Sequence, residues 1–338
     1  MINLIEEIRG SIDKIDEEIL KLLSKRKDLA REVGKLKENL DLPVFDKKRE
    51  EEILKNIANK AKKLGLDVES AYSIFGSIFQ SSRSEQQKNM DKVECSVKNI
   101  GLIGFGRFGK LIVNHLSNAF KFYVYNRSDK DKEIKQFGAI PASLKEACSQ
   151  EIVILAVPIS EIEDILKNIK NLLRKDTIVI DCCSVKEHPI GLMKKILPKS
   201  VQLLGTHSMF GPDSASDSLE GRKIVLCRER IEDKSYSQIK RFLESKKLLV
   251  IESTPKEHDM QMAKSLVLTH FIGRALMGMK ASNLKIDTKS YRDLIKILDT
   301  VRNDTWQLFE DMNKFNKYAK GVRTDFIRSI QKIDKKVK

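Results

Sequence analysis

Apolar residues recur at alternating steps of four and three near the start of the chain, the pattern of a long helix with one apolar stripe. A helix over residues 3–40 would be roughly 55 Å long, which exceeds the width of a small domain. We therefore expect the stripe to pack against a partner chain in a homodimer. Its members are Leu4, Ile8, Ile12, Ile15, Ile19, Leu22, Leu29, Val33, Leu36 and Leu40.

Arg26 occupies the stripe position between Leu22 and Leu29. An arginine on an inward face is costly unless it meets a partner. Two interpretations stay open at this point. Either the side chain reaches out to solvent near a helix crossing, or it binds an anionic ligand.

Two shorter helices are predicted next. Pro43 ends the first helix, and a second runs over residues 46–63 until Gly65 stops it. The third covers residues 68–87, and residues 89–96 form a polar linker. Residues 1–90 are thus expected to form an all-α, three-helix domain.

Beyond Lys98 the pattern changes to short apolar runs separated by helical stretches. Strands are predicted at the glycine-rich run from Lys98 and at residues 122–125, 151–157, 177–181, 202–206, 222–227 and 248–252. Helices are predicted near 160–173, 188–196 and 233–245. This alternation predicts a doubly wound α/β Rossmann domain over residues 97–253. No strand pattern follows Pro255, so residues 254–338 are expected to form an all-helical domain for dimerisation or substrate binding.

The composition fits a globular protein of two or three domains, with 338 residues, 41% of them hydrophobic and 33% charged. No apolar run reaches the roughly 18 residues of a membrane span, and Met1–Arg9 has no secretory character. The five cysteines lack C-x-x-C spacing. We expect a cytoplasmic protein with reduced thiols and no metal site.

A net charge of +15 is compatible with a nucleic-acid partner or with small anionic substrates. The lysines are spread along the chain, and aromatic residues make up only 6% of it. Stacking platforms for single strands are therefore not expected, and small anions are favoured over nucleic acid.

A glycine turn carries the first specific motif. Gly104, Gly106 and Gly109 form G-x-G-x-x-G, with Arg107 and Phe108 between them. In a dinucleotide fold the first glycine permits the turn, the second lets the backbone approach a pyrophosphate and the third lets the helix pack closely. A strand precedes this turn and a helix follows it, as that site requires.

The end of the next strand indicates which nicotinamide cofactor would bind. NAD-binding chains usually carry an acidic residue there, about 20 residues past the glycines, for the ribose hydroxyl. This chain has Asn126, Arg127 and Ser128 instead. Arg127 can form charge-assisted bonds to a 2′-phosphate, so NADP is preferred over NAD, which stays possible.

The first ninety residues resemble the all-helical chorismate mutase family. The similarity is strongest in residues 26–37 and in Pro43-Val44 followed by residues 46–50. The family's catalytic positions are matched in order and spacing by Arg9, Arg26, Lys37, Asp46, Arg49, Glu50, Ser82 and Gln86.

The resemblance implies a pericyclic rearrangement of chorismate to prephenate, which needs positioning and charge stabilisation but no general base. It implies that Arg9 comes from the partner subunit and binds the substrate carboxylates with Arg26 and Arg49. Lys37 and Gln86 would donate to the breaking ether oxygen. The supporting contacts to the ring, its hydroxyl and a carboxylate would come from Glu50, Asp46 and Ser82.

Two loops after predicted strands resemble signatures of the prephenate and arogenate dehydrogenase family. They are Cys183-Ser184-Val185-Lys186-Glu187 and the run 206–213, Thr-His-Ser-Met-Phe-Gly-Pro-Asp. The similarity extends through Glu257-His258-Asp259 and the helical residues beyond, covering nearly all of 98–330. Ser208 stands where that family usually has proline.

The resemblance implies oxidative decarboxylation of prephenate, so that the second half of the chain would consume what the first half makes. His207 would accept the proton of the ring hydroxyl, because the ordinary pKa of histidine, about 6.5, suits a base. Ser184 would hydrogen-bond the same hydroxyl and His207. Substrate binding is assigned to Lys186, His270 and Arg274.

One departure from the family concerns substrate choice. Many prephenate-specific members carry a carboxylate-binding arginine where this chain has Ile297. Either Arg292 or Arg302 could substitute for it, or the pocket differs. Arogenate has an amino group in place of the keto group, so an acid such as Asp213 could bind it. Prephenate is favoured because a fused mutase supplies it, and arogenate is the alternative.

Two other classes of protein were considered. The β-hydroxyacid dehydrogenases share the glycine turn and the Asn-Arg-Ser run, but their catalytic lysine helix is not evident here. A basic coiled-coil regulator that binds nucleic acid would explain the charge and the long helix. It would not explain His207 together with Ser184.

Overall fold

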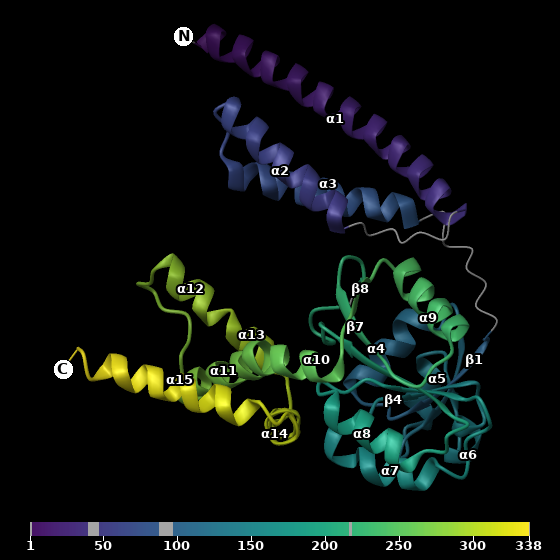
Figure 1. Cartoon of the computed structure of the whole chain (residues 1–338). Coiled ribbons are helices and arrows are strands. Elements are labelled where there is room, and N and C mark those ends of the chain that lie inside the picture. The colour runs from purple at the N-terminus through teal and green to yellow at the C-terminus, as the bar shows by residue number, and fades with distance from the viewer. Residues whose placement is uncertain (1, 40–46, 88–96, 216–217, 338) are drawn as a thin grey trace. The chain divides into compact units, whose positions relative to one another are not determined.

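The computed structural model describes residues 2–39, 47–87, 97–215 and 218–337 (Figure 1). The chain divides into two compact units. One contains the described residues up to 87 together with 219–222 and 238–249, and the other contains the remainder from residue 97. Within the described ranges, no helix combines the length and the apolar character that crossing a membrane demands.

Three helices form the N-terminal part, as the sequence predicted: α1 (Ile2–Asn39), α2 (Lys47–Lys63) and α3 (Val68–Gln87). Gly65 follows α2 with a φ of +70°, a conformation that favours glycine and lets the chain reverse. A small core joins α2 to α3 through Ile57, Ala61, Ala71 and Phe79. The three-helix expectation is confirmed.

The stripe on α1 is mostly open to solvent within a single chain. Ala30 is buried toward the C-terminal end of the helix, where α1 packs against α3. Leu4, Ile12 and Ile19 are 58, 51 and 48% exposed. Exposed apolar residues in an unbroken row are unusual for a monomer.

The second unit is built on an eight-stranded sheet in the order β3-β2-β1-β4-β5-β6-β7-β8. Neighbouring strands from β3 to β6 pair in parallel, and β7 runs antiparallel to β6. The strands are β1 (Asn99–Ile103), β2 (Lys121–Tyr125), β3 (Ile140–Pro141), β4 (Ile152–Leu155), β5 (Ile178–Asp181), β6 (Gln202–Ser208), β7 (Lys223–Arg228) and β8 (Leu249–Glu252). The order reverses between β1 and β4, which is where such sheets bind ligands.

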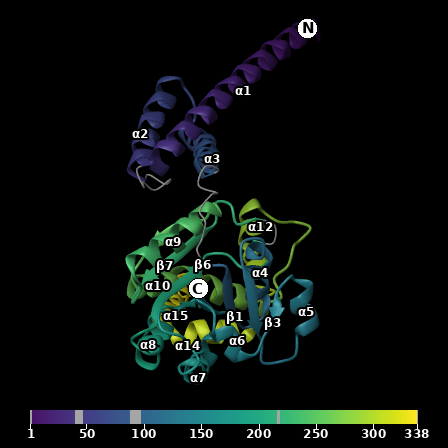
Figure 2. The same ribbon diagram turned by 90° about the vertical axis from the view of Figure 1, so that its right-hand side faces the viewer.

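Helices cover both faces of this sheet, as Figure 2 shows. They are α4 (Arg107–Leu116), α5 (Asp131–Gln136), α6 (Leu144–Cys148), α7 (Ile162–Ile169) and α8 (Glu187–Ile196). A further helix, α9 (Asp233–Ser245), has residues in both units. One buried cluster joins Val153 of β4 and Val179 of β5 to Leu166 of α7 and Met193 of α8. The predicted Rossmann fold is confirmed. The two-residue strand β3 was not predicted, because it is too short to show a period.

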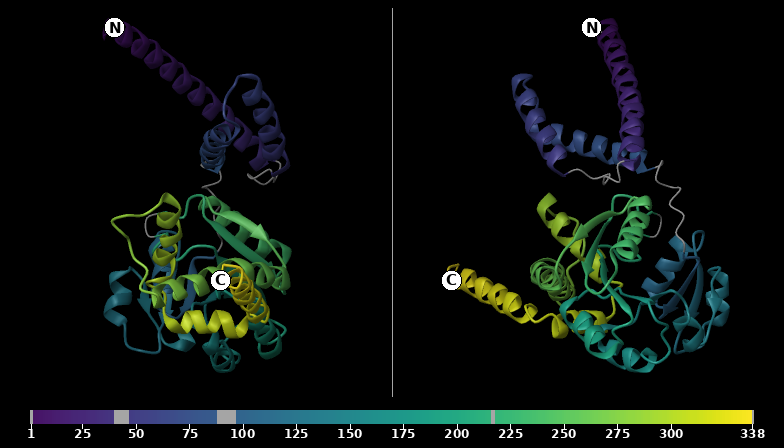
Figure 3. Two further views of the ribbon diagram at one scale, coloured as in Figure 1. Left: turned by 90° about the vertical axis from the view of Figure 1, so that its left-hand side faces the viewer. Right: turned by 45° about the vertical axis from the view of Figure 1, so that its right-hand side comes forward.

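The C-terminal part is helical, as predicted, and α15 runs out from it to the end of the chain (Figure 3). Its elements are α10 (Pro255–Met262), a π-helical turn (Ala263–Val267), α11 (Leu268–Gly278), α12 (Lys289–Ile295), α13 (Ile297–Val301), α14 (Trp306–Phe315) and α15 (Ala319–Asp334). Gly273 allows α11 to approach α13, since a Cβ there would lie 2.8 Å from the Val301 side chain. This three-part architecture agrees with the sequence analysis. The boundaries at 90, 97 and 253 stay predictions.

Candidate active sites

The glycine turn between β1 and α4 is shaped for close approach. Gly104 has a φ of +101°, and a Cβ there would lie 2.4 Å from the Ala156 carbonyl oxygen. A Cβ on Gly109 would lie 2.3 Å from the Gly104 oxygen. At Gly106, by contrast, a Cβ would meet no described atom within 4 Å. Protein packing thus explains the outer glycines, while the open space at the middle one fits the pyrophosphate of a dinucleotide.

The loop after β2 lies beside this turn. Asn126 accepts a hydrogen bond from the Phe105 amide (2.9 Å) and donates to the backbone and side-chain oxygens of Ser128. Lys130 donates to the Phe105 carbonyl. The Arg127 side chain is 82% exposed and lies 3.3 Å from Glu161. Two cations therefore stand on the loop that would face an adenosine ribose.

His207 is near the end of β6 and is 7% exposed. Its Nδ1 lies 2.8 Å from His258 Nε2, and the Nδ1 of His258 lies 2.8 Å from Asp259 Oδ1. Burial holds the pKa of His207 well below the ordinary value, helped by the nearby His258 and Lys186. A neutral imidazole results, which can accept a proton.

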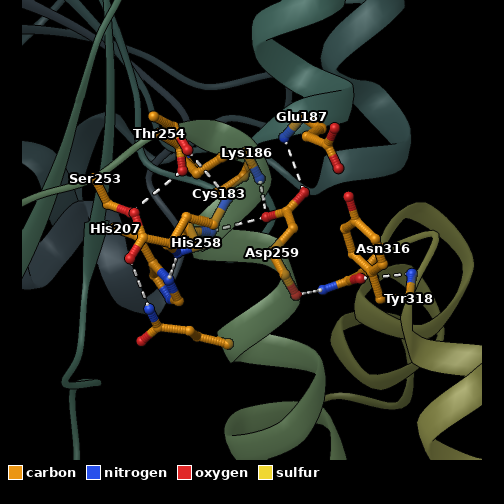
Figure 4. Close-up of polar contacts among 12 residues, drawn as sticks. Cys183, Lys186, Glu187, His207, Ser253, Thr254, His258, Asp259, Asn316 and Tyr318 are labelled. Atoms are coloured by element: carbon orange, nitrogen blue, oxygen red, sulfur yellow. Dashed lines mark hydrogen bonds and ion pairs between the residues drawn. The ribbon is translucent and has the colours of Figure 1, made fainter.

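Asp259 is the centre of the contacts around this histidine pair (Figure 4). Its carboxylate accepts the backbone N–H groups of Lys186 (2.7 Å) and Glu187 (2.9 Å) at the start of α8. Its own carbonyl accepts from the Asn316 side chain (2.8 Å). His258 and Asp259 belong to a run that resembles the dehydrogenase family, but their sequence context alone indicates no role for them. A polar pair in the first turns of a helix carries no local signal of burial.

One of the expected contacts near His207, the hydrogen bond from Ser184, is not formed. Ser184 Oγ is buried and has no hydrogen-bond partner within the described part of the chain, and His207 Nδ1 bonds to His258. Lys186 is fully buried, forms an ion pair with Asp181 and donates to the Thr206 carbonyl (2.6 Å). The lysine thus links the ends of β5 and β6, and its ammonium group is directed to Asp181 and the Thr206 carbonyl. Its position follows from Asp181, whose buried carboxylate requires a cation.

A second polar cluster joins the glycine turn to the helical part. Arg107 contacts Asp213 (2.5 Å) and the Asn303 carbonyl (2.8 Å). Arg274 donates to the Asp304 carbonyl (2.5 Å), and its guanidinium lies over the Trp306 ring at 5.5 Å.

Asp304 stands within this cluster, and the sequence analysis did not single it out. Its carboxylate lies 3.7 Å from His270 Nε2 and 3.6 Å from Arg107. Burial raises the pKa of Asp304 and lowers that of His270, which is 2% exposed. The cluster brings together three residues assigned to substrate binding, namely Asp213, His270 and Arg274.

The N-terminal unit has a site of a different kind. Arg26 donates to Ser82 Oγ and lies over the Phe79 ring at 5.8 Å. Partial burial lowers the pKa of Arg26, while the charge of Glu50 acts in the opposite direction. The structure therefore brings together Arg26, Glu50 and Ser82 from three helices. Of the two interpretations of Arg26, the geometry supports an inward position, and binding of an anion there stays a prediction.

The other expected mutase residues are placed as follows. Lys37 is half-buried on α1, and Arg49 is exposed and lies 2.7 Å from Glu52. Arg9 is exposed on the N-terminal half of α1. Asp46 and the side chain of Gln86 lie outside the described residues.

Family comparisons divide the chain in the same way. Residues 8–87 match chorismate mutase type II, residues 119–252 match the nucleotide-binding domain of prephenate dehydrogenase and residues 275–338 match the TYRAAT1-like C-terminal domain.

Individual proteins are also similar to this chain. Over 245 residues the chain is 30% identical to arogenate dehydrogenase 2, chloroplastic, of Arabidopsis thaliana, covering 70% of this chain and 68% of that protein. It is 25% identical to the T-protein of Haemophilus influenzae over 79% of this chain and 68% of that one. The crystal structure of prephenate dehydrogenase from A. aeolicus, with hydroxyphenyl propionate and NAD+, has the same fold, with a TM-score of 0.59, 21% identity, and coverage of 72% and 91%.

Proposed function

The chain belongs to the family of bifunctional enzymes of tyrosine biosynthesis that join a chorismate mutase to a prephenate or arogenate dehydrogenase, and from this we propose that it makes prephenate in α1–α3 and oxidises it at His207. The observation that carries the second half of the proposal is the buried, neutral His207. Only Nδ1 of that ring makes a side-chain hydrogen bond to a described residue, so Nε2 is available for a substrate hydroxyl.

In the mutase site, charge placement is the whole of the chemistry. Chorismate must be held as a compact dianion while its ether bond breaks, and fixed cations are what favours that geometry. Arg26, supported by Ser82 and Phe79, is the central anchor. The remaining contacts are assigned to Lys37, Arg49, Glu50, Asp46 and Gln86, with Arg9 supplied by the partner subunit across the exposed stripe.

In the dehydrogenase site, His207 Nε2 takes the proton of the ring hydroxyl while the hydride leaves the ring carbon that carries this hydroxyl. A bound nicotinamide cofactor supplies the hydride acceptor. Loss of carbon dioxide then makes the ring aromatic. Ser184 follows β5, the neighbour of β6, and its unused Oγ is suited to bonding the substrate hydroxyl. His270 and Arg274, with the Trp306 ring beneath the guanidinium, are assigned to the substrate's carboxylate end.

NADP is the cofactor we favour. The exposed guanidinium of Arg127, with Lys130 on the same loop, supports binding of a 2′-phosphate. Gly106, Arg107, Phe108 and the Asn126–Ser128 loop would surround the dinucleotide. NAD would lose the phosphate contact but keep all others.

Arogenate is the alternative substrate, and Asp213 is the observation that favours it. This carboxylate is 47% exposed and pairs with Arg107 in the second cluster. An ammonium group could compete for it, whereas a keto group could not. The homodimer and cytoplasmic location expected from the sequence complete the proposal.

One coupled assay tests this function. The full chain is given chorismate with NADP or NAD, and prephenate and arogenate are then supplied separately. We expect reduced cofactor to form from chorismate and from prephenate, faster with NADP. Turnover of arogenate but not of prephenate would make arogenate the assigned substrate in place of prephenate. If no prephenate forms from chorismate when the cofactor is left out, the mutase assignment is refuted.

A further inference from the structure

Three buried side chains form a line behind the proposed base. His207, His258 and Asp259 are 7, 2 and 1% exposed. The two imidazoles are joined at 2.8 Å, and His258 is joined to the carboxylate at 2.8 Å. In Figure 4 the two rings lie to the left of Asp259 and the start of α8 lies above it.

The direction of hydrogen bonding along this line is determined by its end. A carboxylate can only accept, so His258 must carry its proton on Nδ1. The Nε2 of a neutral His258 is then an acceptor, and His207 must donate to it from Nδ1. The remaining nitrogen of His207, Nε2, is therefore left as a lone pair.

We propose that His258 and Asp259 are positioning residues that hold His207 in the Nδ1-protonated tautomer with Nε2 ready to accept the substrate proton. The inference rests on the proposed function, in which His207 is the base. It assigns a role to two residues that neither the sequence motif nor the comparisons explain.

The surroundings of Asp259 support this assignment. A carboxylate this deeply buried would be costly without donors, and two backbone N–H groups at the start of α8 provide them. The other charges near His207 are Lys186 and its partner Asp181. Once Nε2 has accepted a proton, the imidazolium faces the repulsion of Lys186. Asp259, acting through His258, offsets that repulsion.

Kinetics of the full chain test the proposal. Asp259→Asn keeps the shape but can present an N–H to His258, which favours the wrong tautomer. We expect kcat for prephenate to fall about 10²–10⁴-fold, with little change in KM for the cofactor. His258→Gln retains an oxygen that can accept from His207 Nδ1 and should keep far more activity than His258→Leu.

Two readouts separate positioning from folding. Without Asp259 the protonated His207 is less stable, so its pKa falls and the acidic limb of the kcat profile moves to lower pH. The chain has only five histidines, so ¹H–¹⁵N spectra of the ¹⁵N-histidine-labelled chain report the tautomer of His207, assigned with His207→Asn. We expect the Nδ1-protonated form in the wild type and its loss in Asp259→Asn.

Asn316→Ala is the matched control, because it removes a contact to the Asp259 backbone without touching the imidazoles. It should leave the tautomer and the pH profile unchanged. Equal loss of kcat in Asn316→Ala and Asp259→Asn, with the same pH profile, would overturn the proposal. Wild-type kinetics in Asp259→Asn beside an inactive His207→Asn would also overturn it while leaving the proposed function intact. An active His207→Asn would instead refute the base assignment itself.

Discussion

The proposed mutase site in α1–α3 and the proposed dehydrogenase site at the end of β6 stabilise charge in different ways. Arg26 is partly exposed and carries a permanent charge, and it lies on a helix whose apolar stripe is open in one chain. His207 is buried and neutral, and the groups that position it belong to the same compact unit. In the proposed function the first site thus depends on a partner subunit, and the second depends on burial and protonation.

This difference has a physical origin. A pericyclic rearrangement needs only fixed charges, which arginine provides at any physiological pH. Proton removal needs a group whose charge can change, and burial is what keeps that group uncharged. We therefore expect the mutase to respond to dilution and the dehydrogenase to respond to pH.

The largest expected effect is that of His207→Asn. Dehydrogenase kcat should fall about 10²–10⁴-fold, because asparagine cannot accept a proton near neutral pH. Cofactor binding should be nearly unchanged. Chorismate should still be converted, so prephenate should accumulate with NADP present, as chromatography would show. Near wild-type NADPH production would move the base elsewhere, with His270 the next candidate.

Arg26→Ala should remove most of the mutase activity while the dehydrogenase still uses supplied prephenate. A charge-assisted hydrogen bond is worth about 1.5–3 kcal/mol, or about 10- to 150-fold in rate. Lys21→Ala, which removes an exposed cation of the same helix, is the control and should change neither activity. Parallel loss of both activities in a folded protein would contradict the separation of the two sites.

Mixing variants tests the shared site directly. Arg9→Ala and Arg26→Ala should each be poor mutases alone. In a mixed dimer one of the two sites combines the intact Arg26 of one chain with the intact Arg9 of the other, so a random mixture should regain about a quarter of wild-type activity. No recovery on mixing would mean that both arginines act within one chain.

Arg127→Ala should raise KM for NADP by about 10- to 150-fold, the equivalent of one charged hydrogen bond. KM for NAD should barely change, which makes NAD the internal control. Steady-state kinetics with both cofactors measures the ratio. Equal effects on the two would remove the 2′-phosphate assignment.

The smallest expected effect is on stability. The pKa of His207 is lowered in the folded state, so below about pH 6.5 the unfolded chain binds more protons. Stability of the dehydrogenase unit should therefore fall as pH drops through this window, by at most about 1.4 kcal/mol per pH unit for this group. His188 and His270, whose pKa values burial also lowers, add to the slope. The free energy of unfolding, measured with denaturant at several pH values, should depend less steeply on pH in His207→Asn than in the wild type. An unchanged pH dependence would contradict the buried, neutral histidine.

Much of the architecture was predictable from the sequence because it depends on local patterns. The stripe on α1, the stop at Gly65 and the glycine turn at Gly104 each follow from residues that are close in sequence. The apolar run 202–206 likewise indicated that His207 lies at the carboxyl end of a buried strand, but the loop expected there begins later, because β6 extends to Ser208 and includes His207. The two-residue strand β3 was missed because its pairing with β2 supplies what its own residues do not show.

Only the tertiary structure decided how the dehydrogenase site is held. His258 is 51 positions from His207, and Asp259 is 73 from Lys186, so no local pattern could pair them. From the sequence, Lys186 was expected to bind substrate and Ser184 to hydrogen-bond His207. Folding instead buried Lys186 against Asp181 and left Ser184 without the bond to His207. The physical reason is the same in each case. Local sequence determines which backbone conformation a segment adopts, whereas desolvation and pairing of charged groups depend on what other segments bring within reach.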